Sequence, residues 1–142
     1  MDNALKAAII KARALQLYYH YCHNLVTGCA FHSDHSFFGA SYAALEGSYD
    51  SLVEYFIAIY GNSVFSTKEI TELTCDELED LEMNSMSAEG MYQLAVTFEQ
   101  DFQMYLVDVN QVARLGLQNA VQGMATESDV RLYKIRQRLA GK

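Results

Sequence analysis

The chain has 142 residues, of which 51% are apolar and 20% are charged, and its formal net charge is −8. These values predict a single domain spanning residues 1–142 and exclude disordered and fibrous chains. Proline is absent, which favours long helices and excludes turn-rich β architectures. No apolar run is long enough to cross a bilayer, and Asp2, Lys6 and Lys11 interrupt the segment where a secretory signal would lie. We therefore expect a cytoplasmic protein with no membrane partner.

The charge is distributed unevenly along the chain. Residues 1–40 carry three bases and two acids, residues 41–110 one base and fourteen acids, and residues 111–142 six bases and two acids. An acidic surface attracts cations and repels nucleic acid, so we predict weak or no DNA binding. The basic residues near the C-terminus are of the kind that the end of a helix favours. They are Arg131, Lys134, Arg136, Arg138 and Lys142.

Apolar residues recur at alternating spacings of three and four in the first half of the chain. This period predicts a helix over residues 3–27, ended by Gly28. The same period predicts a second helix, for which Ser33 and Asp34 offer an N-cap and Gly61 marks the end.

The second half of the chain predicts one short helix and two further packed helices. The acidic segment 74–81, with Thr74 as N-cap, predicts a short helix within a long connection. A third apolar stripe continues until Gly116 or Gly123, and residues 126–141 predict a short fourth helix. The predicted fold is all-α, a four-helix bundle with a short helix in the connection between helices two and three.

The cysteines give no sign of a disulfide framework. Cys22, Cys29 and Cys75 are odd in number and form no C-x-x-C pair, which also argues against a thiolate zinc site. We expect buried thiols at these positions.

All four histidines lie within sixteen residues, at the junction of the first two predicted helices. They are His20, His23, His32 and His35. Neutral imidazole is the commonest side-chain ligand of transition metals, and residues three apart share a helix face. The cluster predicts either a metal site or histidines that satisfy ordinary helix-end and core hydrogen bonds.

The carboxylates for a metal site cannot come from the di-iron pattern of a single bundle, because the chain contains no Glu-x-x-His. Asp50 and Glu54 share a helix face that points away from the predicted core. Fifteen residues separate His35 from Asp50, which is about 22 Å along a helix. One ion cannot join them within a chain. A two-fold-related copy with an antiparallel second helix could bring its Asp50 and Glu54 to His23 and His35.

The spacing of these residues resembles the signature of the Dps mini-ferritins. In that pattern a His is followed by a Gly five residues later, a Phe, a second His twelve residues after the first, an Asp fifteen further on and a Glu four beyond. The residues that carry the resemblance are His23, Gly28, Phe31, His35, Asp50 and Glu54. It covers the first two predicted helices, and beyond residue 61 only the layout of the helices agrees.

The resemblance implies a ferritin-like fold and a hollow dodecamer built from two-fold dimers. Such a shell oxidises ferrous iron, preferably with hydrogen peroxide, and stores the ferric product, which protects against oxidative damage. The resemblance further implies that His23 and His35 of one subunit, with Asp50 and Glu54 of its partner, form the catalytic metal site. Iron is the expected substrate, and zinc is an alternative ion for the same residues.

Two positions depart from the Dps pattern. The family often has Asp four residues after the second His, where this chain has Gly39, and Trp after the first His, where it has Asn24. Iron entry in the family implies a role for Glu127 and Asp129 at the start of the fourth helix. Tyrosines could replace the missing Trp as oxidisable groups, although aromatic residues at helical spacing are more often core. The tyrosines concerned are Tyr18, Tyr19, Tyr21, Tyr42 and Tyr49.

Two other interpretations stay open at this point. One is a non-catalytic assembly that binds zinc or another divalent ion, with His20 and His32 as further ligands. The other is a structural helical bundle with a degenerate ferroxidase site and no metal. Gly39 and the missing Trp motivate the first, and in the second the histidines satisfy ordinary helix-end and core hydrogen bonds.

Overall fold

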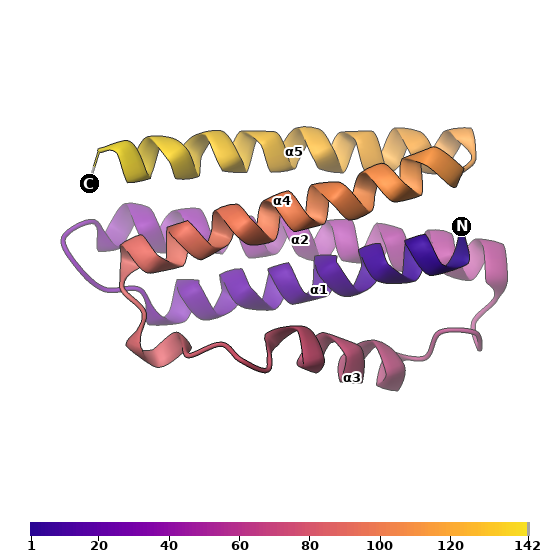
Figure 1. Cartoon of the computed structure of the whole chain (residues 1–142), viewed down its shortest axis with the longest axis horizontal. Helices are drawn as coiled ribbons and strands as arrows, with labels where there is room; N and C mark the ends of the chain where they lie inside the picture. Colours follow the sequence, from indigo (N-terminus) through magenta and orange to yellow (C-terminus); the bar gives the residue numbers. More distant parts are fainter. Residues whose placement is uncertain (142) are drawn as a thin grey trace.

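The computed structural model describes residues 1–141, and over that range the chain is all-helical (Figure 1). The α-helices are α1 (Asp2–Leu25), α2 (Phe31–Tyr60), α3 (Thr67–Leu78), α4 (Ala88–Val112) and α5 (Leu115–Ala140), with a 3₁₀ helix, η1 (Met83–Ser85), before α4. The four long helices form a bundle, and α3 lies along α1 on the side away from α5. The prediction of an all-α chain with a short helix in the second connection is confirmed. Within the described range, no helix is both long and apolar enough to cross a membrane.

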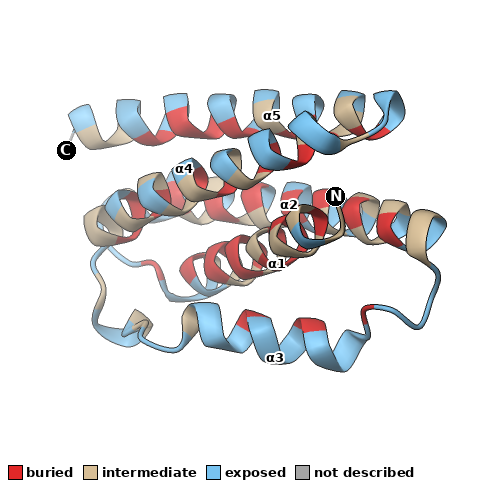
Figure 2. Cartoon of the chain, turned by 45° about the vertical axis from the view of Figure 1, so that its right-hand side comes forward, coloured by how far each residue is buried: buried red, intermediate tan, exposed pale blue. Residues whose placement is uncertain are grey.

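The core lies between the facing stripes of the long helices (Figure 2). The apolar stripe of the predicted helix 3–27 is buried throughout, at Leu5, Ala8, Ala12, Leu15, Tyr19, Cys22 and Val26. On α2 the stripe is buried at Phe38, Leu45, Leu52 and Phe56, while the tyrosines between them are only half-buried. The face of α2 that carries those tyrosines thus reaches the surface of the single chain.

The start of α2 differs from the predicted cap, because the helix begins at Phe31. Asp34 is buried and binds Arg138, whose Nε and Nη2 lie 3.0 and 3.1 Å from its two carboxylate oxygens. The hydroxyl of Tyr92 also donates to Asp34, at 2.7 Å. Asp34, which the sequence predicts as a local N-cap, instead connects α2 to α4 and α5.

The short helix α3 begins earlier than predicted. Its N-cap is Ser66, whose hydroxyl accepts the backbone N–H of Glu69 at 3.1 Å. Thr74, the predicted cap, is buried within the helix and donates its hydroxyl to the carbonyl oxygen of Ile70 at 2.7 Å. The predicted bounds 74–81 are therefore wrong. The sequence contains two successive capping-box patterns, at residues 66–69 and 74–77, and the helix begins at the first because Ile70 and Thr74 are buried.

The boundary between α4 and α5 was also predicted wrongly. α4 ends at Val112, Ala113 and Arg114 are extended, and α5 begins at once, so Gly116 and Gly123 lie inside α5. The predicted short fourth helix is therefore 26 residues long. Two extended residues make this break without Gly or Pro, so the sequence carries no conventional stop signal.

The buried thiols were predicted correctly only for Cys22. Burial raises the pKa of the Cys22 thiol to about 12, so it stays protonated and inert at neutral pH. Cys29 and Cys75 are exposed, and all three cysteines are free.

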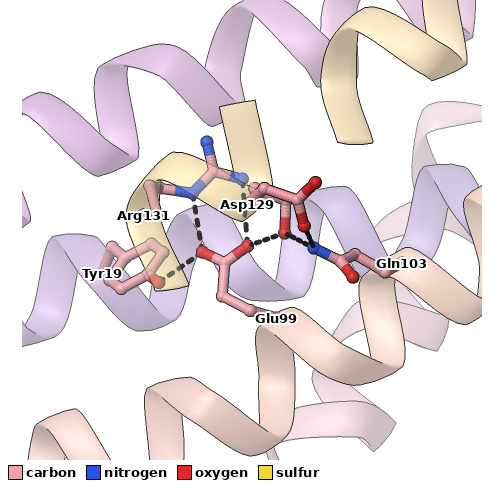
Figure 3. A network of polar contacts seen from close by, with 6 residues as sticks. Tyr19, Glu99, Gln103, Asp129 and Arg131 are labelled. Atoms are coloured by element: carbon pink, nitrogen blue, oxygen red, sulfur yellow. Dashed lines mark hydrogen bonds and ion pairs between the residues drawn. The ribbon is translucent and has the colours of Figure 1, made fainter. Parts of the chain in front are cut away.

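A buried carboxylate lies in the middle of the bundle (Figure 3). Glu99 of α4 is 0% exposed, and Arg131 of α5 binds it through Nε at 2.6 Å and Nη2 at 3.0 Å. The hydroxyls of Ser128 and Tyr19 donate to the same carboxylate. Burial acts to lower the pKa of Arg131, but its hydrogen bonds to Glu99 and the charge of Glu99 outweigh that effect and raise it.

The basic residues near the C-terminus thus have more specific roles than the predicted helix-end preference. Arg131 and Arg138 form ion pairs with carboxylates on α4 and α2. Lys134 and Arg136 are exposed. Lys142 lies outside the described residues.

We predict that Arg131→Met lowers the free energy of unfolding by about 3–5 kcal/mol, because it leaves a buried carboxylate without its counter-charge. Urea denaturation followed by circular dichroism measures this change. The matched control is Arg136→Met on the exposed face of α5, which should change stability by less than about 0.5 kcal/mol. Equal effects of the two substitutions would contradict a stabilising role for the Glu99 pair.

Candidate metal centre

The end of α1 and the start of α2 bring two imidazole rings into contact. The rings of His23 and His35 stack with centroids 3.7 Å apart and an interplanar angle of 20°. Nδ1 of His23 lies 2.8 Å from the carbonyl oxygen of His35, and Nδ1 of His35 lies 2.8 Å from the carbonyl oxygen of His23. The two residues therefore form a closed, reciprocal pair between the helices.

These hydrogen bonds determine which ring nitrogen can bind a metal. A carbonyl oxygen only accepts, so each Nδ1 must carry the hydrogen, and in the neutral ring each Nε2 then has a free lone pair. Nδ1–H bonded to a backbone carbonyl is the usual arrangement of metal-binding histidines. Among residues 1–141, no hydrogen bond occupies the Nε2 of His23 or His35. The arrangement can therefore supply two nitrogen ligands.

The connection between α1 and α2 explains why the two rings meet. Gly28 has a φ of +113°, which most side chains disfavour, and Val26 buries its side chain in the core. The reversal is therefore short and anchored. Phe31, in the first turn of α2, stacks on the other side of His35 at 5.0 Å. His35 is held between two rings.

Gly39 provides the space for the ring of His23. A Cβ atom at this position would lie 2.9 Å from Nδ1 and 3.0 Å from Cε1 of His23. The ring therefore lies directly against the backbone of α2. The site where the Dps pattern often places an Asp is occupied by the imidazole of His23.

The other two histidines differ in their surroundings. His20 stacks on Tyr42 at 4.2 Å, and Tyr42 contacts the ring of His23 edge-on at 5.3 Å. His20 thus extends the aromatic surface one turn along α1, with its ring 6.5 Å from that of His23. His32 is exposed and contacts only the adjacent Phe31 among the aromatic rings described.

The predicted carboxylates lie on the same helix as His35 but far along it. Asp50 and Glu54 are exposed on α2, and within residues 1–141 neither forms a hydrogen bond or ion pair. The rise of a helix separates Asp50 from His35 by about 22 Å. A single chain thus brings the histidines together and leaves the carboxylates apart. In the described part of the chain, no group of three or more His, Cys, Asp and Glu residues is close enough to hold an ion.

The expected iron-entry residues are not at a helix start. Glu127 and Asp129 lie in the middle of α5, which begins at Leu115. Asp129 accepts a hydrogen bond from the side-chain amide of Gln103 at 2.8 Å (Figure 3). The reason for assigning them to a pore is therefore wrong, because the fourth long helix begins earlier than predicted.

The sequence interpretation missed the buried polar groups around Glu99 and Asp34. Both lie in the buried register of their helices, where Glu99 follows Ala95 by four residues and precedes Phe102 by three. An acid on an apolar stripe is a detectable signal, because a carboxylate is almost never fully buried without a partner. The sequence does not say which base is that partner.

The chain matches no protein-family model and no curated protein. The assignment of a function therefore depends on the geometry of this site.

We predict that Gly39→Ala weakens the binding of a divalent ion about 10–100-fold. The added methyl group displaces the ring of His23 and breaks its hydrogen bond to the carbonyl oxygen of His35. Calorimetric titration with zinc measures the affinity. Gly123→Ala in α5 is the matched control, since no atom lies within 4 Å of the added Cβ. It should leave the affinity unchanged and stabilise the helix by up to about 1 kcal/mol. Equal zinc affinities in the two variants would exclude the positioning role of Gly39.

Proposed function

We propose that this chain is a subunit of a ferritin-like, iron-storing cage of the Dps type. It oxidises ferrous iron with hydrogen peroxide at sites shared by two subunits and thereby protects against oxidative damage. The observation that carries the proposal is the reciprocal pair of His23 and His35, whose Nδ1–H groups are both bound to carbonyl oxygens. That pairing supports two Nε2 ligands in fixed orientation.

A second copy of the chain can supply the carboxylates. If α2 packs antiparallel to its counterpart with His35 beside Glu54 of the partner subunit, Gly39 falls beside the partner subunit's Asp50. The helices then cross near residues 44 and 45. The residues around that point are small and exposed, namely Ala43, Ala44 and Gly47, and they allow two helix backbones to approach closely. The symmetry of such a dimer produces two equivalent sites.

The proposed ligand set suits the oxidation of iron. Two imidazoles and two carboxylates bind ferrous iron as substrate with a ligand charge of minus two. The carboxylates stabilise the additional positive charge of the ferric product, and the backbone carbonyls hold both imidazoles in the binding tautomer. Peroxide is the proposed electron acceptor. The oxidised iron then passes to the mineral store.

The charge distribution also supports a role with metal cations. The acidic residues of segment 41–110 include the exposed Glu46, Asp50 and Glu54 on α2. Such a surface raises the local concentration of ferrous iron. DNA binding remains disfavoured, since Arg131 and Arg138 are engaged in internal ion pairs. We propose a dodecamer on the basis of the resemblance to Dps proteins, and the mass of the particle in solution tests it.

Replacing both paired histidines should abolish the rapid oxidation of iron. We expect His23→Ala with His35→Ala to reduce the initial rate of ferrous oxidation by peroxide to that of the protein-free reaction, because the nitrogen ligands are lost. The ultraviolet absorbance of the ferric product measures the rate. His32→Ala is the control, since His32 lies outside the pair, and it should keep the wild-type rate. Equal rates in the double variant and wild type would remove the assigned site.

Mixing two inactive variants tests whether the site is shared between subunits. One variant carries His23→Ala and His35→Ala, and the other carries Asp50→Asn and Glu54→Gln. After unfolding and joint refolding in equal amounts, about a quarter of the wild-type activity should return, because half of the dimers are mixed and each has one intact site. A site formed within one chain would give no recovery.

The same measurements address the zinc-binding alternative. Residue 39 offers no carboxylate ligand, which favours binding of an ion that is not oxidised at the site. Zinc is such an ion, and the imidazole pair suits it. Zinc binding at the paired histidines without any acceleration of ferrous oxidation would select this function, with His20 as the nearest further ligand.

A further inference from the structure

Two buried tyrosines lie in the core of the bundle, and each donates its hydroxyl to a carboxylate. Tyr19 of α1 donates to Glu99, and Tyr92 of α4 donates to Asp34. Each carboxylate is also held by an arginine through two nitrogens. The chain therefore contains two copies of the same arrangement, a tyrosine, a carboxylate and an arginine, contributed by α1, α2, α4 and α5.

The rings of these tyrosines belong to one aromatic cluster. Phe38 lies between them, with its ring centroid 6.0 Å from that of Tyr19 and 4.8 Å from that of Tyr92. Phe37 contacts the same two tyrosines at 6.2 and 5.6 Å. The cluster is linked to the candidate metal centre through the helices, because Tyr19 lies one turn before His23 on α1 and Asp34, which binds Tyr92, directly precedes His35 on α2.

Tyr19 and Tyr92 differ chemically from the other tyrosines of the cluster. Removing an electron from a phenol makes it a strong acid, so a base must be within hydrogen-bond distance to take the proton. The hydroxyl of Tyr18 donates at 2.6 Å to the carbonyl oxygen of Met91, which is not a base. Only a carboxylate can accept the proton in a core that excludes water.

The phenols remain neutral until they are oxidised. Burial raises the pKa of Tyr19 well above its usual value, and the charge of Glu99 adds to this. Burial also raises the pKa of Tyr92, and its hydrogen bond to Asp34 raises it further. Both side chains therefore stay hydrogen-bond donors at neutral pH, and loss of an electron must be coupled to transfer of the proton.

We propose that the pairs Tyr19–Glu99 and Tyr92–Asp34 supply the second electron that peroxide requires at the histidine site. This inference rests on the proposed function. Four ligand groups suit one ferrous ion, which gives one electron, whereas peroxide needs two to form water. Without a second donor, reduction by one electron releases a hydroxide ion and a hydroxyl radical.

The step balances within the protein, the iron and the solvent. Ferrous iron and one tyrosine each give one electron, the O–O bond of peroxide breaks, and two solvent protons complete two waters. The phenol proton passes to Glu99 or Asp34 and leaves a neutral tyrosyl radical. A further ferrous ion then reduces the radical, and the proton returns from the carboxylate to the phenolate oxygen.

The experiment compares the wild type, Tyr19→Phe with Tyr92→Phe, and Tyr18→Phe. Tyr18 is the matched control because it is buried in the same cluster, 5.9 Å from Tyr19, without a carboxylate acceptor. Each protein is mixed with ferrous iron and peroxide, freeze-quenched for electron paramagnetic resonance, and assayed with a spin trap. We expect the double variant to lose most of the persistent tyrosyl signal and to release several-fold more hydroxyl radical, while Tyr18→Phe matches the wild type.

A second arm without iron separates this inference from the proposed function. A photogenerated ruthenium(III) polypyridyl complex oxidises each protein, and the tyrosyl signal is recorded after the radicals of exposed tyrosines have decayed. Loss of that signal in the double variant alone supports the pairs even if no variant oxidises iron, which would contradict only the proposed function. A signal that survives in the double variant, or is lost equally in Tyr18→Phe, overturns the inference. If the double variant does not fold, the single variants Tyr19→Phe and Tyr92→Phe replace it. Each should remove part of the tyrosyl signal, and an unchanged signal in both overturns the inference.

Discussion

The reciprocal contact between His23 and His35 is the interaction on which the candidate centre depends. Each ring is bound to the backbone of the opposite helix, so the orientation of both imidazoles follows from the spacing of α1 and α2 rather than from flexible side-chain choices. Gly39 sets that spacing, because any Cβ atom there would meet the ring of His23. Together these contacts produce a rigid pair of nitrogen ligands at the surface of one chain.

The buried carboxylates connect the stability of the bundle to the same region. Asp34 immediately precedes His35 and is bound by Arg138 in the last turns of α5, while Glu99 is bound by Arg131 nearer the middle of the bundle. Removing one partner of a buried ion pair strongly destabilises a protein. The two pairs therefore help to keep α5 packed against the other helices. The tyrosines on these carboxylates pack against Phe38 in one aromatic cluster. The proposed electron donors therefore belong to the same ion-paired groups that hold the helices together.

Much of the fold could be predicted from the sequence because apolar periodicity reports directly on burial. The stripe of α1 and the end of α2 at Gly61 follow from that period and from one glycine. The starts of α2 and α3 and the break after Val112 could not be predicted, since each is decided by tertiary contacts or by an extended pair without Gly or Pro. The partners of Glu99 and Asp34 were missed for the same reason, because ion pairing between distant helices leaves no local pattern. For the site, the sequence placed His23 and His35 at the same helix junction, but no pattern in it indicates the hydrogen bonds that orient the rings.

The geometry at Gly39 also explains why the missing carboxylate and the tyrosine pairs belong together. A Cβ atom at residue 39 would lie 2.9 Å from Nδ1 of His23, so a carboxylate ligand at this position would require the ring of His23 to shift. With the pair, the proposed site has two imidazoles and two carboxylates, which suit one ferrous ion. One ion cannot supply both electrons that peroxide takes up. A chain that binds iron in this way needs another electron donor. The proposed donors are Tyr19, one helical turn before His23, and Tyr92, which donates to the residue next to His35.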